Sequence, residues 1–418
     1  MLERIWEISS DKKKDIIGNF LLFLMFFGEV AYLYSASSAI LIACGIPGII
    51  TFFYIKKNDA YLMPFLACIA VGIVGLVSIN RLFVLNCSWR GCLRIVFISL
   101  PIAYLLCNVH INRYVALIFF YVVLLYTGVM IILADPVELY RIFKASSRNY
   151  ISVLLIACLF PYYLACERDY KEVSIYPAIL SLFASIYVQS RGGILASGIL
   201  VILSFGRNIL VGIVKKSSQD KKKLISFLIA TGFLVGIIFF TFSNLGLVQS
   251  NLHNSDTAES TVEDSEVYNS DVDDSNIDDS ANYLSRFTKT EEYPITRQDM
   301  WKEYITVTGS SIKNIILGSP LTTCPLILEE AYNSHNSYFM THSYMGIVGF
   351  LGVLAGGIGC LILCIKKKEY ALLFLSTTFL IRALTDYLFP MLFCDCIILF
   401  MILKVGIEIM GGAFEQKK

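Results

Sequence analysis

The chain has 418 residues, of which 56% are hydrophobic and only 16% are charged, and its mean hydropathy is +0.67. Soluble proteins average about 25% charged residues, so this composition excludes an ordinary soluble domain and predicts an all-α, polytopic membrane protein. The formal net charge of +1 offers no bulk attraction for nucleic acid, which we do not expect as a partner.

Apolar runs long enough to cross a bilayer recur along most of the chain. A crossing needs about 20 mostly apolar residues. We place spans at residues 15–35, 37–55, 61–79, 92–107, 113–134, 150–166, 174–190, 192–213, 224–243, 343–365, 369–388 and 390–411. The sequence therefore predicts a membrane helix bundle of about twelve transmembrane helices. The first run is too long for a signal peptide and is expected to stay as a span.

Basic clusters set the expected orientation. They lie at Lys12–Lys14, Lys56–Lys57, Lys215–Lys216 with Lys221–Lys223, Lys366–Lys368 and Lys417–Lys418. With twelve spans and a cytoplasmic N-terminus, all of these clusters fall on the cytoplasmic side, as the positive-inside rule requires. Both termini are then cytoplasmic, and the long segment between residues 243 and 343 is one large extracytoplasmic loop.

The long loop divides into two parts of different composition. Residues 244–285 contain ten acidic residues and neither Lys nor Arg, with few apolar side chains, which predicts disorder. Calcium binding by the acidic run is an alternative, although the glycine and final glutamate of an EF-hand loop are missing. Residues 286–342 are expected to be structured, with one amphipathic helix from about Arg297 and a Gly-Ser-Pro turn at 318–320. The chain thus divides into 1–243 (spans 1–9), 244–285, 286–342, and 343–418 (spans 10–12 and the C-terminus).

Two arginines on the outer side are candidates for anion binding. Arg191 precedes Gly192 and Gly193 at the start of a span, where glycines would let a ligand approach the backbone and the helix N-terminus would favour a phosphate or pyrophosphate. The alternative is an interfacial arginine that ends a hairpin. Arg297 opens the loop helix and would supply a second anion contact, or it is a solvated residue at a helix start.

Two histidines lie where the loop re-enters the membrane. His335 could take a proton from a hydroxyl near neutral pH, and His342, seven residues later, could share its helical face. The alternatives are an interfacial histidine satisfied by water, or zinc binding by the pair, for which no acidic or cysteine ligand has matching spacing.

The remaining candidates are charged residues in or beside apolar runs. Arg382 and Asp386 are four residues apart and could pair on one helical face, either to hold helices together or to contact substrate. The outer loop 135–152 carries Arg148, which could recruit a lipid-linked phosphate or lie on a surface helix. Cys87 and Cys92 could form a disulfide, and no Cys/His spacing predicts a metal site.

Three segments together resemble the O-antigen polymerase and ligase superfamily (Wzy/WaaL type). The first is SRGGILA at 190–196, similar to the family's Ser-Arg-x-Gly segment. The second is the R-x-x-x-W helix of the long loop, Arg297 and Trp301, followed by LGSP at 317–320. The third is HNSYFMTHSYMGIVGF at 335–350, which is similar to the family's His-Asn-Ser stretch followed by Gly-x-x-Gly.

The resemblance implies a GT-C-like, metal-independent glycosyltransferase of the bacterial cytoplasmic (inner) membrane without a cofactor. Its donor would be a glycan on undecaprenyl pyrophosphate, with Arg191 and Arg297 holding the pyrophosphate and His335 deprotonating or orienting the acceptor hydroxyl. A chain-length regulator and a flippase would be its protein partners. The sequence leaves the carboxylate partner of His335 unidentified, because His342 occupies the position where the family often has an acidic residue.

We expect a polymerase that transfers a growing surface polysaccharide (O-antigen, capsule or exopolysaccharide) to a lipid-linked repeat unit. A ligase that transfers the glycan to a lipid A core sugar is the first alternative. The second is a transporter or flippase of lipid-linked oligosaccharide, which would show two related halves; the sequence has no such symmetry.

Overall fold

The computed structural model describes residues 10–54, 62–84, 89–133, 150–169, 171–188, 190–215, 297–329 and 334–415. The chain forms two compact units, residues 1–212 with 297–418, and residues 213–296. Nearly all described residues belong to the first unit. The predicted span at 224–243 and the acidic segment 244–285 lie outside the described residues, so both remain predictions.

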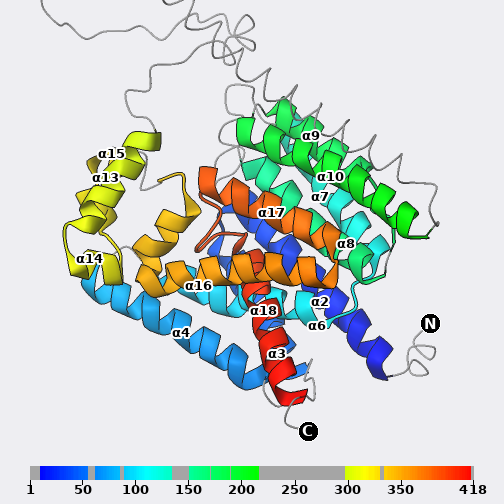
Figure 1. The fold of residues 1–418 in the computed structure, drawn as a ribbon, viewed down its shortest axis with the longest axis horizontal. Coiled ribbons are helices and arrows are strands. Elements are labelled where there is room, and N and C mark those ends of the chain that lie inside the picture. Colours follow the sequence, from blue (N-terminus) through cyan, green and yellow to red (C-terminus); the bar gives the residue numbers. More distant parts are fainter. Residues whose placement is uncertain are drawn as a thin grey trace, which may run out of the picture. The chain divides into compact units, whose positions relative to one another are not determined.

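The described residues are all-helical and contain no strand (Figure 1). The helices of the N-terminal half are α2 (Ser10–Ser35), α3 (Ser38–Tyr54), α4 (Leu62–Phe83), α5 (Trp89–Arg94), the π-helix η1 (Ile95–Ser99), α6 (Leu100–Asn108), α7 (Arg113–Leu133), α8 (Tyr150–Arg168), α9 (Tyr176–Tyr187) and α10 (Arg191–Lys215). Those of the C-terminal half are α13 (Arg297–Gly309), α14 (Ile312–Leu317), the 3-10 helix η4 (Leu321–Thr323), α15 (Pro325–Glu329), α16 (Ser337–Lys367), α17 (Tyr370–Thr385) and α18 (Asp395–Glu415).

The structure is that of an α-helical membrane protein. Within the described residues, six helices are long and apolar enough to cross a membrane: Lys12–Ser35, Leu62–Phe83, Trp89–Asn108, Arg113–Leu133, Tyr150–Arg168 and Ser337–Lys367. Every predicted span except 224–243 coincides with a helix. However, α9 has 12 residues and is about 18 Å long, which is short of the roughly 30 Å of a hydrocarbon layer. The number of about twelve crossings therefore remains a prediction.

Helix α8 is buried on all sides, since 94% of its most apolar 18-residue stretch lies inside the protein. It packs against α7, α9 and α17. A helix that is apolar all round belongs in a core, and α8 follows this rule along nearly its whole length. Its one buried carboxylate, Glu167, lies 3.3 Å from Nε of Arg207 on α10. The same carboxylate accepts a hydrogen bond of 2.7 Å from the backbone N–H of Ala371 in α17. Glu167 thus links three helices in the interior.

A second buried ion pair joins helices near the N-terminus. Arg94 at the end of α5 donates from Nε to Glu29 of α2 over 3.0 Å, and both side chains are almost fully buried. The Arg94 guanidinium also lies 5.0 Å from the ring centre of Tyr32. A buried charge without a partner would be very costly, so these contacts explain how an arginine is tolerated within a membrane-crossing helix.

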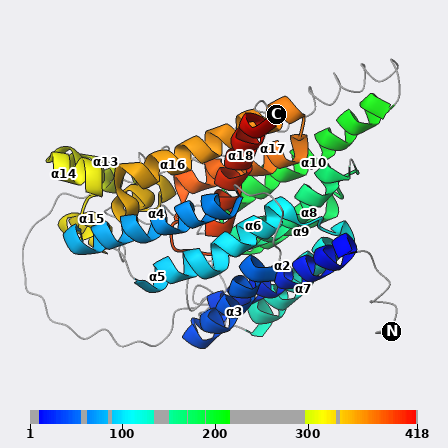
Figure 2. The ribbon, with the colours of Figure 1, turned by 90° about the horizontal axis from the view of Figure 1, so that it is seen from below.

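Helix α16 contacts both α17 and α18, and α18 crosses it at a steep angle (Figure 1 and Figure 2). Helix α16 is broken at Gly346. Gly346 has φ 65° and ψ −166°, a conformation that only glycine adopts readily. A Cβ atom on Gly346 would lie 2.2 Å from the carbonyl oxygen of Ile316 at the end of α14. The first segment of α16, residues 337–345, therefore has its own direction and lies against the loop helices.

Two expected boundaries were wrong. The single loop helix predicted from Arg297 is two helices, because Gly309 ends α13 and the Ser311 hydroxyl accepts the Asn314 N–H at 3.1 Å to begin α14. The last span, expected from residue 390, begins at Asp395. Residues 386–394 form a non-helical turn instead, in which the Tyr387 hydroxyl donates to the Pro390 carbonyl at 2.6 Å.

Candidate functional site

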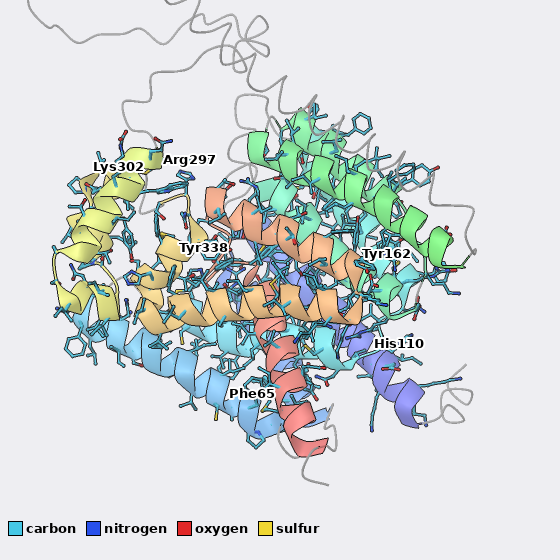
Figure 3. The ribbon with its side chains drawn as sticks, in the orientation of Figure 1. Phe65, His110, Tyr162, Arg297, Lys302 and Tyr338 are labelled. Atoms are coloured by element: carbon cyan, nitrogen blue, oxygen red, sulfur yellow. The ribbon has the colours of Figure 1, made fainter. Side chains whose placement is uncertain are left out.

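A polar cluster lies where the end of α17 meets the starts of α10, α13 and α16. Nη1 of Arg297, the first residue of α13, donates to the carbonyl of Thr385 over 2.7 Å. The hydroxyl of Ser337, the first residue of α16, donates to the Asp386 carbonyl over 2.7 Å. Figure 3 labels Arg297 on α13 and Tyr338 on the first segment of α16, on the same side of the molecule as the end of α17. We call Arg297, His335, Arg382 and Asp386 the α17 cluster.

The centre of the cluster is an ion pair between Arg382 and Asp386. Nη2 of Arg382 lies 2.7 Å from Oδ2 of Asp386, and the Arg382 side chain is 6% exposed. Nη1 of Arg382 also donates to the Thr385 hydroxyl at 3.1 Å, while the Tyr387 N–H donates to the other Asp386 oxygen at 2.9 Å. The predicted pairing of residues 382 and 386 is confirmed, and both side chains are held in fixed positions.

The Asp386 carboxylate also lies close to His335. Nδ1 of His335 lies 3.8 Å from Oδ1 of Asp386, and the imidazole is 25% exposed. The geometry therefore supplies a carboxylate for His335 from the end of α17, a position 51 residues further along the chain that sequence spacing around His335 could not reveal.

The expectation that His335 and His342 share a helical face was wrong. The Asn336 side chain caps α16 by accepting the N–H groups of Tyr338 (3.0 Å) and Phe339 (3.2 Å), so the helix begins after His335. His335 itself has φ +49°, outside helical geometry. A helix N-cap at position 336 thus separates the two histidines into different environments.

His342 instead connects α16 to the loop helices. Its Nε2 lies 2.8 Å from the Ile315 carbonyl, which can only accept, so Nε2 carries hydrogen and Nδ1 accepts from the Tyr304 hydroxyl at 2.8 Å. Both ring nitrogens are engaged in these contacts, which leaves no room for the zinc site considered for the histidine pair. His342 has a structural role at the junction of α13, α14 and α16.

Helices α13 and α14 are docked on the first segment of α16. Nε1 of Trp301 donates to the Ser334 carbonyl at 2.8 Å, one residue before His335. Burial raises the pKa of the Tyr304 hydroxyl, which keeps it protonated as a donor to His342. The Phe339 ring lies between Trp301 and Tyr304, with centroid distances of 6.1 and 5.3 Å. These contacts hold the loop helices beside His335.

Arg191 is the first residue of α10, which places its backbone at the helix N-terminus as expected. The two following glycines lie against protein side chains. A Cβ atom on Gly192 would lie 2.4 Å from Nη1 of Arg382, and one on Gly193 would lie 2.4 Å from Oγ of Ser152. The predicted approach of a ligand to these glycines stays a prediction.

Two residues singled out in the sequence cannot be compared with the structure. Three residues that contribute contacts to the site were not predicted. Arg148 and Cys87 lie outside the described residues. Sequence reasoning did not single out Ser337, Thr385 or Tyr304. Their contacts join segments far apart in the chain, and only the Asn-Ser pair at 336–337, a recognisable helix start, carried a local signal.

The cluster has an excess of positive charge. Two arginines, Arg297 and Arg382, face one aspartate, and the N-termini of α10 and α13 point their partial positive charge to the same region. Guanidinium groups bind phosphate oxygens through paired N–H donors, and an imidazole with a carboxylate partner can accept a proton. The arrangement can therefore hold an oxyanion and deprotonate a nearby hydroxyl.

No protein-family model, curated protein or solved structure matches this chain.

Proposed function

We propose that the chain is a surface-polysaccharide polymerase of the O-antigen type. It would transfer a growing glycan from undecaprenyl pyrophosphate to a lipid-linked repeat unit. The single observation that carries the proposal is the α17 cluster, in which the Asp386 carboxylate pairs with Arg382 and lies 3.8 Å from His335, and Arg297 donates to the adjacent Thr385 carbonyl. The resemblance of residues 190–196, 297–301 and 335–350 to the polymerase and ligase superfamily supports the same reading.

The proposed step forms one bond and breaks one bond. The acceptor sugar hydroxyl attacks the anomeric carbon of the donor glycan, and the bond from that carbon to the pyrophosphate oxygen breaks. The hydroxyl proton passes to His335, whose imidazolium is stabilised by Asp386. The pyrophosphate leaves as an anion, and its developing charge is stabilised by Arg297, by Arg382 and by Arg191 at the start of α10.

This chemistry needs no nucleotide sugar and no metal ion. The arginines supply the positive charge that a divalent cation supplies in many phosphate-leaving reactions. The proposal also fits a protein embedded in a bilayer, because the donor and acceptor are both membrane lipids. We place the enzyme in a bacterial cytoplasmic membrane with the cluster on the extracytoplasmic side and both termini cytoplasmic. A flippase would deliver its substrate, and a chain-length regulator would act with it.

The test is polymer formation by purified full-length protein in vesicles that contain the lipid-linked repeat unit. We expect wild-type protein to give a ladder of products. His335→Ala should reduce the rate by about 100- to 10,000-fold, the usual contribution of a general base. His110→Ala is the matched control, because this exposed histidine pairs with Asp169 at 3.5 Å, away from the cluster. Arg297→Ala should lower the rate, while Lys302→Ala on the exposed side of the same helix should not.

The outcomes separate the competing functions. Activity that survives both His335→Ala and Arg297→Ala would exclude the catalytic assignment. Transfer to a lipid A core acceptor in place of a repeat unit would identify a ligase, which uses the same donor. Movement of the lipid-linked oligosaccharide across vesicles without a new glycosidic bond would identify a flippase.

A further inference from the structure

A groove on the membrane-facing surface runs between α3 and the helix formed by α5 and η1. Its volume is about 410 Å3, and its walls are mostly apolar. Five of its apolar lining side chains are exposed on the protein surface: Ile42, Ile46, Ile49, Leu93 and Phe97. Since both walls belong to apolar helices, one of which is long enough to cross a membrane, the groove faces hydrocarbon rather than water.

The groove is closed at one end and open at the other. A Cβ atom on Gly48 would lie 1.8 Å from the Phe97 carbonyl oxygen, so α3 and η1 are in direct backbone contact there. One turn earlier, a Cβ atom on Gly45 would lie 4.0 Å from the nearest atom, Cβ of Phe97. The π-helical turn of η1 lies along this wall, and such turns are often found at functional sites.

The open end carries a positive charge. Arg90 lines this end of the groove, is exposed, and donates to the hydroxyl of Ser38. A guanidinium has five N–H donors, and the contact to Ser38 uses one of them. Trp89, which is 42% exposed, precedes Arg90, and tryptophan is typical of the boundary between headgroups and hydrocarbon. Arg94 also lines the groove, but its charge is matched by Glu29.

The length of the groove fits one leaflet. Ser38 and Ile49 are eleven residues apart on α3, which corresponds to about 16 Å along the helix axis. Half of a typical hydrocarbon layer is about 15 Å thick. A chain that starts at the level of Arg90 would therefore reach the middle of the bilayer at the closed end of the groove.

We infer that this groove binds one anionic phospholipid, with its phosphate on Arg90 and one acyl chain between α3 and η1. The site is separate from the α17 cluster and does not depend on the function proposed for that cluster. The positive charge at the headgroup level selects an anionic lipid over a zwitterionic one, because the Arg90 guanidinium has no carboxylate among the residues that line the described groove.

The test counts lipids bound to full-length protein by native mass spectrometry during titration with phosphatidylglycerol or phosphatidylcholine. We expect wild-type protein to bind one phosphatidylglycerol about tenfold more tightly than phosphatidylcholine, as one charge-assisted contact would give. Arg90→Gln should remove this preference. Gly45→Leu, which fills the groove and keeps Arg90, should displace the lipid.

Two control variants match these changes. Arg113→Gln replaces another arginine at a helix start, one that lies over the ring of Tyr114, and should keep the preference. Gly128→Leu adds the same side chain to α7 at a position with no atom within 4 Å, and should keep the bound lipid. Lipid binding is compared only between proteins that unfold at the same temperature as wild type.

Four results would overturn the inference. One is an unchanged lipid preference in Arg90→Gln, and another is an equal loss of preference in Arg113→Gln. The third is retention of the lipid by Gly45→Leu, which would leave only a surface headgroup contact. Displacement of the lipid by inorganic phosphate alone would likewise show that the acyl groove contributes nothing.

Discussion

The replacement Gly192→Ala tests the geometry of the α17 cluster through a residue that carries no functional group. A Cβ atom at position 192 would lie 2.4 Å from Nη1, 2.7 Å from Cζ and 3.2 Å from Nε of Arg382. These distances are well inside van der Waals contact, so the guanidinium must move by about 1 Å, the shortfall from ordinary contact at 3.5 Å or more. Arg382 is buried and bonded to Asp386 and Thr385, which means that the movement breaks those contacts.

The size of the effect follows from two opposing contributions. Losing a charge-assisted hydrogen bond costs about 1.5–3 kcal/mol, whereas alanine is favoured over glycine within a helix by about 1 kcal/mol. We therefore expect Gly192→Ala to lower the free energy of unfolding by about 0.5–2 kcal/mol. The polymerisation rate should fall by about 100-fold, because a displacement of about 1 Å in a catalytic site has effects of this size.

The assays are thermal unfolding of the purified protein and the polymerisation reaction in vesicles. Gly198→Ala is the matched control on the same helix, since no atom lies within 4 Å of its added Cβ, and it should be neutral or slightly stabilising. In an Arg382→Ala background, Gly192→Ala should no longer destabilise the protein. If Gly192→Ala is as active and stable as Gly198→Ala, the contact between residues 192 and 382 is not as described, and the argument fails.

Two further predictions concern the docking of the loop helices. Gly346→Ala should lower the free energy of unfolding by about 1–3 kcal/mol, because φ is +65° and the new Cβ would meet the Ile316 carbonyl; Gly352→Ala, with no atom within 4 Å, is the control in a thermal unfolding assay. Tyr304→Phe should destabilise the protein by about 1–3 kcal/mol, because Nδ1 of His342 loses its hydrogen-bond donor. This replacement should also increase proteolysis of α13. Unchanged proteolysis would show that the Tyr304 hydroxyl does not hold the loop helices.

The helices were predictable because hydropathy is a local property. Each apolar run within the described residues gave a helix close to its expected place, and Arg297 does begin a helix. The pairing of Arg382 with Asp386 was also predicted from their spacing of four residues, although Asp386 has an extended backbone just after the end of α17 and does not share its helical face.

The long-range contacts of the site could not be derived in this way. The segment 345–357 contains several glycines, and Gly346 alone breaks the helix because the end of α14 lies against it. Likewise, His335 meets Asp386 only because a turn after α17 brings residue 386 to the start of α16. The position of Asn336 was a readable capping signal, and applying it would have separated His335 from His342.

The central position of α8 has a consequence for biosynthesis. Its neighbours α7 and α9 are made just before and just after it, but α17 is made much later. Glu167 can meet Arg207 once 40 more residues have been made, whereas its contact with Ala371 needs 204. The side of α8 that contacts α17 therefore faces lipid or insertion machinery until α17 is made. The hydrogen bond from the Ala371 N–H to the Glu167 carboxylate can form only then. The order of synthesis makes α17 the helix that completes the burial of α8.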